Sequence, residues 1–522
     1  MNRETNGVTA PDARRLTLRE VFTAWYPLAG SWLLMGMELP AVSAVISRLP
    51  DPKVSLAAYG GVVFPLSMII EAPIIMLLSA STALSRDRRS YLMLRRFMMR
   101  CGFVLTLLHA LIAFTPLFDL VVGRIIHPPA DVLGPARVGL MIMTPWTWSI
   151  AYRRFQQGVL IRSGRSHLVG IGTMVRLGAN AAILTVGMIL GNLPGVVVGA
   201  TAVAIGVMSE SLFIGIAVRP TLREQFGNAA FRTVRDLLPR RPGRPQGPAA
   251  VGVENRQDGV GSTSECLPAA RDGVSPTSVS RVGDIAPPNG IAPSGDIALS
   301  GDSRPPLTWG AFFEFYIPLA LTSLLLMSTG PIVSATVSRM PRPLDSLAVW
   351  PVINGLTFIL RSLGMAVNEV VVAHLDRPGA IRSLRRFSVL LGLATTTIFA
   401  VVGFTPLARL YFAKVTALSP ELTALATKAV RIVVVMPGFG ALQSWFQGVL
   451  VHSRRTRGIT ESVVIYLGAN LVLLALGIRF VHAPGIFVGL GAVVGAAVCQ
   501  LFWLWRRSRP ALGGLIAGGS RR

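Results

Sequence analysis

The chain has 522 residues, of which 52% are hydrophobic and only 14% are charged, and its mean hydropathy is +0.57. So few charged groups cannot cover the surface of a soluble protein of this size, and the apolar residues come in runs of about twenty, the length with which a helix crosses a bilayer. The composition therefore excludes a soluble protein and indicates an integral membrane protein.

The net charge of +25 comes almost entirely from arginine, because only three of the 50 basic residues are lysine. The arginines lie mostly in short clusters between apolar runs, where positive charge sets the orientation of a membrane protein, so we expect no nucleic-acid partner. Cys101, Cys266 and Cys499 lie far apart, which predicts neither a disulfide framework nor a metal site. The first fifteen residues lack the apolar core of a signal peptide, so the first transmembrane helix is expected to direct insertion.

The chain contains an internal repeat. Segment 157–199 returns at 447–489, and both copies carry Gln-Gly-Val-Leu followed by Leu-Gly-Ala-Asn. A second block, which contains Ser47-Arg48, returns 291 residues later with Ser338-Arg339 (339 − 48 = 291). The protein is a duplicated half.

Apolar runs predict six transmembrane helices in each half. Those of the first half are expected at about residues 22–47, 56–84, 97–120, 136–161, 167–190 and 194–218. Those of the second half are expected at about 311–337, 346–374, 386–411, 424–451, 459–480 and 484–506. An even number of helices returns the second half to the same side of the membrane. The expected fold is therefore an all-α membrane protein of twelve helices, built as two parallel six-helix repeats in a two-lobed bundle.

Arginine clusters recur in every second connection between the predicted helices. The first half carries them at Arg86–Arg96 and Arg153–Arg165, and the second half at Arg377–Arg386 and Arg454–Arg457. Because positive charge is retained on the cytoplasmic side, we expect these connections and both termini to be cytoplasmic, in the plasma or inner membrane.

Five segments are expected along the chain. They are a cytoplasmic tail (1–18), the first six-helix repeat (19–222), a linker (223–307), the second repeat (308–508) and a second cytoplasmic tail (509–522). The linker is rich in Pro, Gly, Ser, Arg and Asp. Such a composition cannot bury a core, so the linker is expected to be a disordered tether.

The sequence carries no motif for catalysis or ATP hydrolysis. The phosphate-binding pattern G-x-x-x-x-G-K-[ST] does not occur, the six histidines show no paired metal-ligand spacing, and no Ser-His-Asp set can be placed. We therefore expect a membrane transporter rather than an enzyme, with no catalytic residue, no metal site and no cofactor.

Four glutamates fall inside predicted transmembrane helices, where an ionisable side chain is costly and marks a functional candidate. Glu38 and Glu71 are candidates for coupling to H⁺ or Na⁺, because burial lets a carboxylate exchange protons near neutral pH. Neither has an acidic equivalent in the other half. Glu210 and Glu369 are secondary candidates. The competing interpretation is that these glutamates form structural salt bridges with buried arginines.

Three intramembrane arginines, Arg176, Arg361 and Arg431, are candidates for binding an anion. The planar guanidinium can pair with two oxygens of a carboxylate or phosphate, and a substrate path is expected between the two halves. The alternative for Arg431 is that its side chain extends to the outer membrane surface.

Prolines within the predicted helices are hinge candidates. Pro40, Pro73, Pro331 and Pro437 each remove a helical hydrogen bond and permit bending. The alternative is that they are tolerated kinks without motion.

One motif closes the predicted fourth helix of each half before a basic loop. It reads Phe155-Gln156-Gln157-Gly158-Val159-Leu160 in the first half and Phe446-Gln447-Gly448-Val449-Leu450 in the second. Together with twelve helices in two parallel halves, it resembles the multidrug, oligosaccharidyl-lipid and polysaccharide (MOP) exporter superfamily, which includes the MATE-type transporters. The resemblance implies two lobes that work by alternating access.

Within that superfamily the second half is similar to the progressive ankylosis family. The similarity lies in Phe315–Leu321, Pro331-Ile332-Val333, Val337-Ser338-Arg339 and Asn368-Glu369. Members of that family are associated with export of anions such as pyrophosphate, ATP and citrate, so the resemblance implies an anionic load, for which Arg176 and Arg361 are suited. The long linker and a first-helix glutamate, where the multidrug branch has aspartate, depart from the family patterns.

These observations predict a secondary active exporter of small organic or phosphate-containing anions, acting as a monomer in the lipid bilayer with H⁺ or Na⁺ as a coupling ion. Two alternatives remain open. The intramembrane glutamates favour a proton- or sodium-coupled multidrug antiporter, and the superfamily also includes lipid-linked saccharide flippases. A membrane scaffold that uses the linker for docking is disfavoured by the duplicated, proline-kinked bundle.

Overall fold

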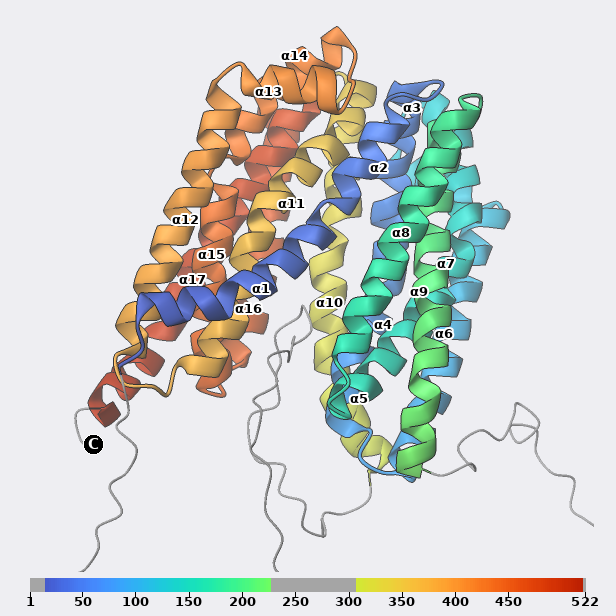
Figure 1. Ribbon diagram of the computed structural model, residues 1–522. Helices are drawn as coiled ribbons and strands as arrows, with labels where there is room; N and C mark the ends of the chain where they lie inside the picture. The colour runs from blue at the N-terminus through green and yellow to red at the C-terminus, as the bar shows by residue number, and fades with distance from the viewer. Residues whose placement is uncertain (1–14, 227–306, 520–522) are drawn as a thin grey trace, which may run out of the picture.

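The computed structural model describes residues 15–226 and 307–519, and helices make up almost all of these two ranges (Figure 1). The greater part of the predicted linker, 223–307, lies outside the described residues. The helices of the first half are α1 (Leu18–Gly36), α2 (Glu38–Ile46), α3 (Pro52–Leu56), α4 (Phe64–Ile75), α5 (Leu77–Leu84), α6 (Arg88–Phe114), α7 (Ala130–Arg162), α8 (His167–Leu190) and α9 (Gly195–Phe226). Those of the second half are α10 (Trp309–Ser338), α11 (Pro343–His374), α12 (Ala380–Phe404), α13 (Leu407–Leu410), α14 (Pro420–Ala429), α15 (Met436–His452), α16 (Arg457–Phe480) and α17 (Gly485–Gly519).

The predicted all-α membrane fold is confirmed. Within the described ranges, eleven helical stretches are long and apolar enough to cross a membrane. The one predicted helix that is missing from these eleven is the fourth of the first half, α7. It has 33 residues and lies in the same bundle (Figure 1), but Arg137, Arg153 and Arg154 make it less apolar. The repeats form two lobes, with α2–α9 in one and α11–α17 in the other.

Two predicted helix boundaries are wrong by about ten residues. The third helix starts at Arg88 rather than near 97, because Asp87 caps it by accepting from the backbone N–H of Ser90 at 2.9 Å. The last helix continues to Gly519 instead of ending near 506. Both extensions are arginine-rich turns that apolarity could not reveal, since a helix need not end where the hydrophobic run ends.

The first helix crosses from its own repeat to the other lobe. A break at Met37 separates α1 from α2, and α1 packs against α11 and α12 of the second lobe. The indole N–H of Trp25 donates to the carbonyl oxygen of Leu363 at 2.9 Å, and Val21 is buried in a cluster with Val367 and Leu384.

The beginning of α10 makes the reciprocal contact with the first lobe. The hydroxyl of Tyr316 donates to the carbonyl oxygen of Pro73 in α4. The ring of Phe97 in α6 packs edge-on against Phe312 and Tyr316, with centroids 4.7 and 5.0 Å away. Each half therefore holds the other through the start of its first helix.

Two repeat-related arginines join the halves just after the ends of α2 and α10, which we call the upper end of the molecule as Figure 1 is drawn. Arg48 donates to the carbonyl oxygens of Lys414 and Val415 in the second half, both at 2.9 Å. Arg339 donates to the carbonyl oxygen of Ile125 in the first half at 2.8 Å. Each guanidinium also donates at 2.6 Å to a carbonyl four residues earlier in its own helix. We call Arg48 and Arg339 the arginine clamps.

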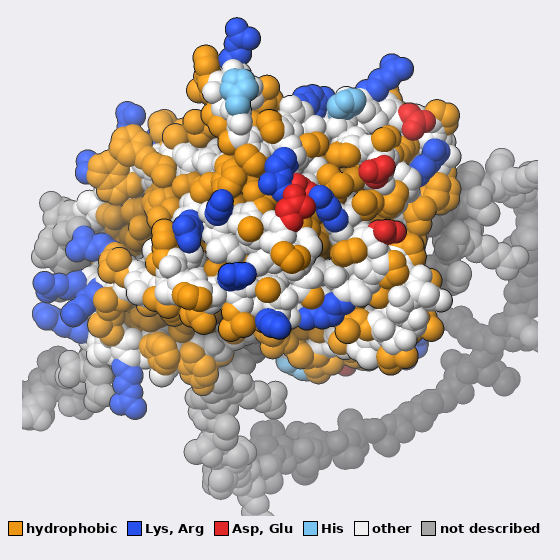
Figure 2. Space-filling model, turned by 90° about the horizontal axis from the view of Figure 1, so that it is seen from above, with side chains coloured by type: hydrophobic (Ala, Val, Ile, Leu, Met, Phe, Trp, Pro, Cys, Tyr) orange, Lys and Arg blue, Asp and Glu red, His pale blue; other side chains and the backbone are white. Residues whose placement is uncertain are grey.

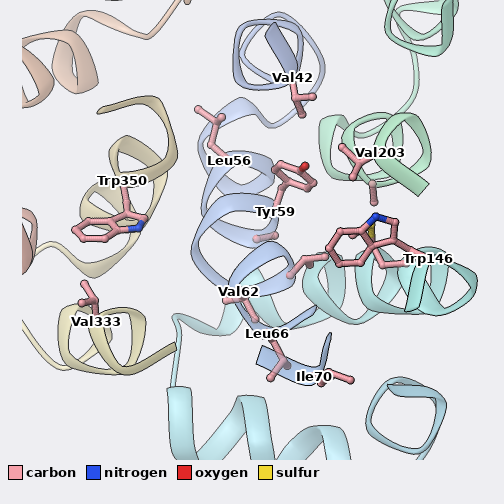
Figure 3. Packing of buried hydrophobic residues seen from close by; sticks show 14 of the residues in the cluster. Val42, Leu56, Tyr59, Val62, Leu66, Ile70, Trp146, Val203, Val333 and Trp350 are labelled. Carbon is pink, nitrogen blue, oxygen red and sulfur yellow. The ribbon is translucent and has the colours of Figure 1, made fainter. Parts of the chain in front are cut away.

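Between the clamps the halves are in direct contact. Gly60 lies against Pro351, its own repeat equivalent (351 − 60 = 291), so the pseudo-twofold axis passes close to this contact. Figure 3 shows the π-helical turn that contains Tyr59 and Val62 packed between Trp350 of α11 and Trp146 of α7. The hydrophobic core is therefore continuous across the seam.

Ion pairs lie over the upper end of this seam. Lys53 of the first half pairs with Asp345 of the second half, and Arg342 bridges Asp345 and Glu421 at 2.6 and 2.5 Å. Figure 2 looks onto this end and shows acidic side chains next to basic ones near the middle of the face. The upper end of the seam is closed.

We expect Gly60→Ala to destabilise the protein. A Cβ atom at Gly60 would lie 2.2 Å from Cβ of Pro351, and overpacking of this kind costs about 1–3 kcal/mol. The matched control is Gly178→Ala, also in a helix, where nothing lies within 4 Å of the added atom; it should be neutral or slightly stabilising. Thermal unfolding of the two purified variants compares them, and equal midpoints would contradict the tight seam.

Candidate functional site

A cavity of about 140 Å³ lies between the two lobes, near the ends of α7 and α11 that lie away from the clamps. It is bounded by α1, α5, α7, α8 and α9 of the first half and by α11 of the second. Its apolar lining includes Leu28, Trp32 and Met35 of α1. Its charged lining consists of Arg153, Arg154, Arg176, Glu210 and Glu369.

Glu210 of α9 is the centre of the charged wall. Its side chain is 1% exposed and forms an ion pair with Arg153. It also accepts from Nε2 of Gln157 at 2.9 Å, and Nε of Arg176 lies 3.4 Å away. A carboxylate enclosed by two guanidinium groups and an amide is typical of a structural ion-pair network, because buried charges need partners. For Glu210 the structural interpretation is therefore favoured over a role in ion coupling.

Glu38 belongs to the same network. Its carboxylate lies 3.0 Å from Nη1 of Arg176 and accepts from Nδ2 of Asn180 at 2.5 Å. Asn180 reaches it because Gly206 in α9 has no side chain: a Cβ atom there would lie 1.6 Å from Oδ1 of Asn180. Glu38, the predicted coupling residue, and Arg176, the predicted anion-binding residue, are thus partners of one another.

Glu71 of α4 differs from Glu38 and Glu210, the other two intramembrane glutamates of the first lobe. It is 1% exposed and, within the described residues, has no basic group within 4.0 Å, and its Oε1 atom has no hydrogen-bond partner. The groups that face it are the hydroxyl of Thr147 and the guanidinium groups of Arg153 and Arg154 at longer range. Its carboxyl can therefore change protonation state without breaking an ion pair.

The cavity presents one arginine and one glutamate that are not neutralised locally. Arg154 has no carboxylate within 4.0 Å in the described part of the chain, and its Nε atom is buried without a partner. Glu369 of α11 faces Trp32 across the cavity, and its Oε2 atom likewise has no partner among the described atoms. Among the described charged residues that line the cavity, these are the two without an ion pair within 4.0 Å.

Arg361 and Arg431 lie elsewhere, so the structure does not bring Arg176 and Arg361 together in one pocket. Arg361 is packed in the second lobe, where Nη2 donates to Oε1 of Gln443 at 3.4 Å. Arg431 is exposed near the upper end; it donates to the carbonyl oxygen of Gly403 at 3.3 Å and stacks over the ring of Phe404. Both arginines make intralobe contacts.

The four hinge candidates have different surroundings. The α1–α2 break lies three residues before Pro40, and the α4–α5 break at Met76 lies three residues after Pro73. A 3₁₀ turn at residues 430–433 precedes Pro437 in α15. Pro331 lies inside an uninterrupted α10. Bending at these positions remains a prediction.

The sequence interpretation missed Arg153, Arg154 and Gln157. Arg153 and Arg154 fall inside the predicted helix 136–161 but belong to an arginine cluster that is expected on the cytoplasmic side. The structure places both inside α7, where Arg153 is only 6% exposed. One signal distinguished them. The loop arginine Arg165 returns in the second half as Arg455, whereas the repeat has Gln443 and Ser444 at the positions of Arg153 and Arg154.

The charged network of the first lobe consists of six buried or half-buried groups: Glu38, Glu71, Glu210, Arg153, Arg154 and Arg176. Their charges sum to zero when all six are ionised. A proton on Glu71 would leave one excess positive charge next to the cavity, where the low dielectric strengthens any interaction with an anion. No group of three or more His, Cys, Asp or Glu side chains that could hold a metal ion occurs in the described ranges.

Glu210→Gln should destabilise the fold. The change leaves Arg153 and Arg176 buried without full charge compensation, and breaking a buried pair from one side costs about 3–5 kcal/mol. Glu224→Gln, on the same helix, is the control, because Glu224 pairs with Arg165 at the surface and such pairs contribute about 0–1 kcal/mol. Chemical unfolding in detergent gives both values; similar losses would argue against Glu210 as the centre of the network.

Comparison with solved structures identifies the fold of this chain. No family model matches the sequence and no curated protein matches it, but solved structures do. An inward-facing multidrug resistance MATE family transporter of the MOP superfamily has a TM-score of 0.61 at 14% identity, over 93% of this chain and 99% of that chain. The lipid II flippase MurJ, in an inward closed conformation, has a TM-score of 0.61 at 11% identity, over 94% and 92%.

A third match is a MOP superfamily transporter from Pyrococcus furiosus, described as having a binding pocket of reversed polarity. Its TM-score is 0.55 at 13% identity, over 95% of this chain and 97% of that chain. The similarity to the progressive ankylosis family stays a prediction. The resemblance to the MOP superfamily is confirmed at the level of the fold: this chain has the MATE-like fold of MOP-superfamily transporters.

Proposed function

We propose that this protein is a secondary active transporter that moves an anion with an apolar portion by alternating access between its two lobes. The observation that carries the proposal is Arg154, a half-buried cation on the wall of the inter-lobe cavity. Its Nε atom is buried without a partner, and no carboxylate lies within 4.0 Å of it among the described residues. Leu28, Trp32 and Met35 on α1 provide the apolar surface opposite. Ligand sites commonly combine such a surface with a few convergent polar groups.

Alternating access requires that one end of the path is closed while the other admits substrate. The arginine clamps and the Gly60–Pro351 contact close the upper end, and the cavity lies beyond them toward the other end. Hydrogen bonds to charged groups contribute roughly 1.5–3 kcal/mol each. Breaking the clamps is therefore within the range that differential binding of substrate and ion can offset.

The distribution of arginines supports one orientation of the molecule in the membrane. The end away from the clamps carries Arg88, Arg89 and Arg96 at the start of α6 and Arg165 after α7. Positive residues of this density favour the cytoplasmic side, so the cavity would receive its substrate from the cytoplasm. Both termini would be cytoplasmic and the membrane would be the plasma or inner membrane.

Glu71 is the coupling residue in this proposal. Protonation of Glu71 gives the network a net positive charge, so a proton and an anion favour each other's binding and move together. An anion with two or more negative charges still carries net negative charge when one proton accompanies it. An inside-negative potential contributes about 2.3 kcal/mol per charge per 100 mV, which favours export.

A second candidate is the flipping of a lipid-linked anion. The cavity reaches from α1 to α8, where Met174 lines it and is 51% exposed. An opening there would admit a lipid-linked headgroup from the bilayer while the tail stays outside. The two candidates share the anion-binding Arg154 and differ in the route of entry.

Arg154→Gln should reduce anion flux by at least about tenfold, since losing one charge-assisted interaction costs roughly 1.5–3 kcal/mol. The assay is flux in proteoliposomes with labelled citrate, pyrophosphate and ATP, with a drug-like cation and a fluorescent lipid-linked diphosphate as further arms. Arg431→Gln, a surface arginine outside the cavity, is the control. Cation flux that depends on Glu369 and is indifferent to Arg154 would overturn the anion proposal in favour of a multidrug antiporter.

Arg48→Gln combined with Arg339→Gln should shift the conformational equilibrium toward a form open at the upper end. The change removes the clamp hydrogen bonds while leaving the cavity intact. Spin labels at exposed Leu120 and Leu407, one on each half, would report a longer inter-label distance in the double variant. Arg219→Gln, also on a helix end but remote from the seam, serves as control, and an unchanged distance distribution would contradict the closing role of the clamps.

A further inference from the structure

The inter-lobe cavity carries two opposite charges that have no counter-ion within the described residues. Arg154 comes from α7 of the first half, and Glu369 comes from α11 of the second half. The Nε atom of Arg154 and the Oε2 atom of Glu369 are buried, and neither has a hydrogen-bond partner in the described part of the chain. Both side chains line the same cavity, yet they form no ion pair with each other within 4.0 Å. The cavity thus lacks one negative and one positive group.

The other charged groups on the cavity wall neutralise one another. Arg153 pairs with Glu210, and Arg176 lies 3.4 Å from Glu210 and 3.0 Å from Glu38. These groups cannot serve the two unpaired side chains without giving up their own partners. Because a charge away from bulk water is costly without a partner, a ligand that supplies both missing counter-charges is favoured over a ligand that supplies one.

The internal repeat relates the two walls of the cavity residue by residue. A Cβ atom at Gly158 would lie 2.6 Å from the carbonyl oxygen of Leu78, and a Cβ atom at Gly448 would lie 3.2 Å from the carbonyl oxygen of Asn368. These two close approaches are equivalent, since both pairs are related by the same offset (448 − 158 = 290 and 368 − 78 = 290). The two halves therefore correspond at an offset of 290 in this region.

At this offset, both unpaired charges correspond to serine. Glu369 corresponds to Ser79 (369 − 79 = 290), and Arg154 corresponds to Ser444 (444 − 154 = 290). Each half thus carries an uncharged residue where the other half carries its charge, so the symmetric packing of the halves requires neither charge. The result is a positive group on one wall of the cavity and a negative group on the other.

We propose that the substrate of this cavity is a dipolar molecule. Its anionic group binds Arg154, its cationic group, such as an ammonium, binds Glu369, and its apolar portion packs against Trp32 and Met35 of α1. Free amino acids and amino-bearing lipid headgroups such as phosphoethanolamine share this chemistry. This substrate class deepens the transport function proposed above and rests on it.

A dipolar substrate connects the two lobes directly. Among the described residues that line the cavity, Glu369 is the one that the second half contributes. The cationic group of the substrate therefore makes its contact with α11, while the anionic group holds Arg154 of α7. A purely anionic ligand would instead bring a second negative charge close to Glu369, and like charges repel strongly where the dielectric is low. Binding of the dipolar form thus favours the arrangement in which both walls face the cavity.

Three probes with one carbon skeleton test this proposal on the purified full-length protein. They are leucine, 4-methylpentanoate, which lacks the ammonium group, and 3-methylbutylamine, which lacks the carboxylate. In calorimetric titration, leucine should bind at least about tenfold more tightly than either analogue, because one charge-assisted contact corresponds to about this factor. Leucine that binds no more tightly than 4-methylpentanoate would overturn the dipolar substrate.

Two variants assign the two charges. In Glu369→Gln the preference for leucine over 4-methylpentanoate should disappear, while 4-methylpentanoate still binds through Arg154. In Arg154→Gln the affinity for leucine should fall at least about tenfold, whereas that for 3-methylbutylamine should not. Glu369→Ser and Arg154→Ser introduce the side chain that the other half carries at the equivalent position, and they should give the same results.

The control is Glu314→Gln, which changes an exposed glutamate of the second half outside the cavity. It should leave the binding of all three probes unchanged. A Glu369→Gln variant that weakens all three probes equally would assign Glu369 a structural role and overturn its contact with the cationic group.

Transport assays distinguish a free solute from a lipid headgroup. In proteoliposomes, flux of labelled leucine that depends on Glu369 would identify a free solute. Transbilayer movement of acyl-labelled phosphatidylethanolamine that depends on Glu369, with phosphatidylglycerol as the anionic comparison, would identify a lipid.

The same measurements separate this inference from the proposed transport function. Preferential leucine binding in a protein that moves no solute or lipid would leave the dipolar site standing and remove transport. Citrate or pyrophosphate flux that depends on Arg154 and is unaffected by Glu369→Gln, together with no preference for leucine, would remove the dipolar substrate and leave anion transport standing.

Discussion

The first lobe is arranged around a single buried carboxylate, that of Glu210. Arg153, Gln157 and Arg176 converge on it from α7 and α8, and Arg176 carries the network on to Glu38 of α2. Charges buried at this depth persist only with partners, so four helices are fixed relative to one another by the need to neutralise them. That constraint leaves Arg154 and Glu71, which lie at the edge of the network, as the groups whose charge can respond to a ligand.

The internal duplication explains the contacts between the two halves but not the charged network of the cavity. Arg48 and Arg339 make the same contacts from opposite sides, and Gly60 meets its own repeat equivalent Pro351. A pseudo-twofold seam of this kind is closed by two equivalent arginine clamps and can open symmetrically. The charged network, in contrast, belongs to the first lobe, since the repeat carries Gln443 and Ser444 in place of Arg153 and Arg154. The frame has thus kept its symmetry, whereas the two cavity walls have diverged.

The first helix of each half packs on the opposite lobe, and α1 in this way connects the seam between the halves to the cavity. α1 provides Trp32 and Met35 to the cavity while resting on the second lobe through Trp25 and Val21. Since α2 continues from it into the first lobe, a change in the angle between the lobes must move α1 relative to the charged wall. In the proposed transport cycle, α1 therefore connects opening of the seam with access to Arg154.

The sequence by itself determined the class, the helix count and the duplication, because apolar runs of membrane length and a repeated motif are local properties of the chain. It also identified Glu38, Glu71, Arg176 and Glu210 as costly intramembrane charges. Only the tertiary structure decided which of them neutralise each other, since Glu38 and Arg176 are 138 residues apart (176 − 38 = 138) and meet through packing. For the same reason, the burial of Arg153 and Arg154, the separation of Arg361 from the cavity and the presence of Glu369 in the same cavity as Arg154 depend on helix rotation and on how far each helix extends beyond its apolar run, which linear spacing does not specify.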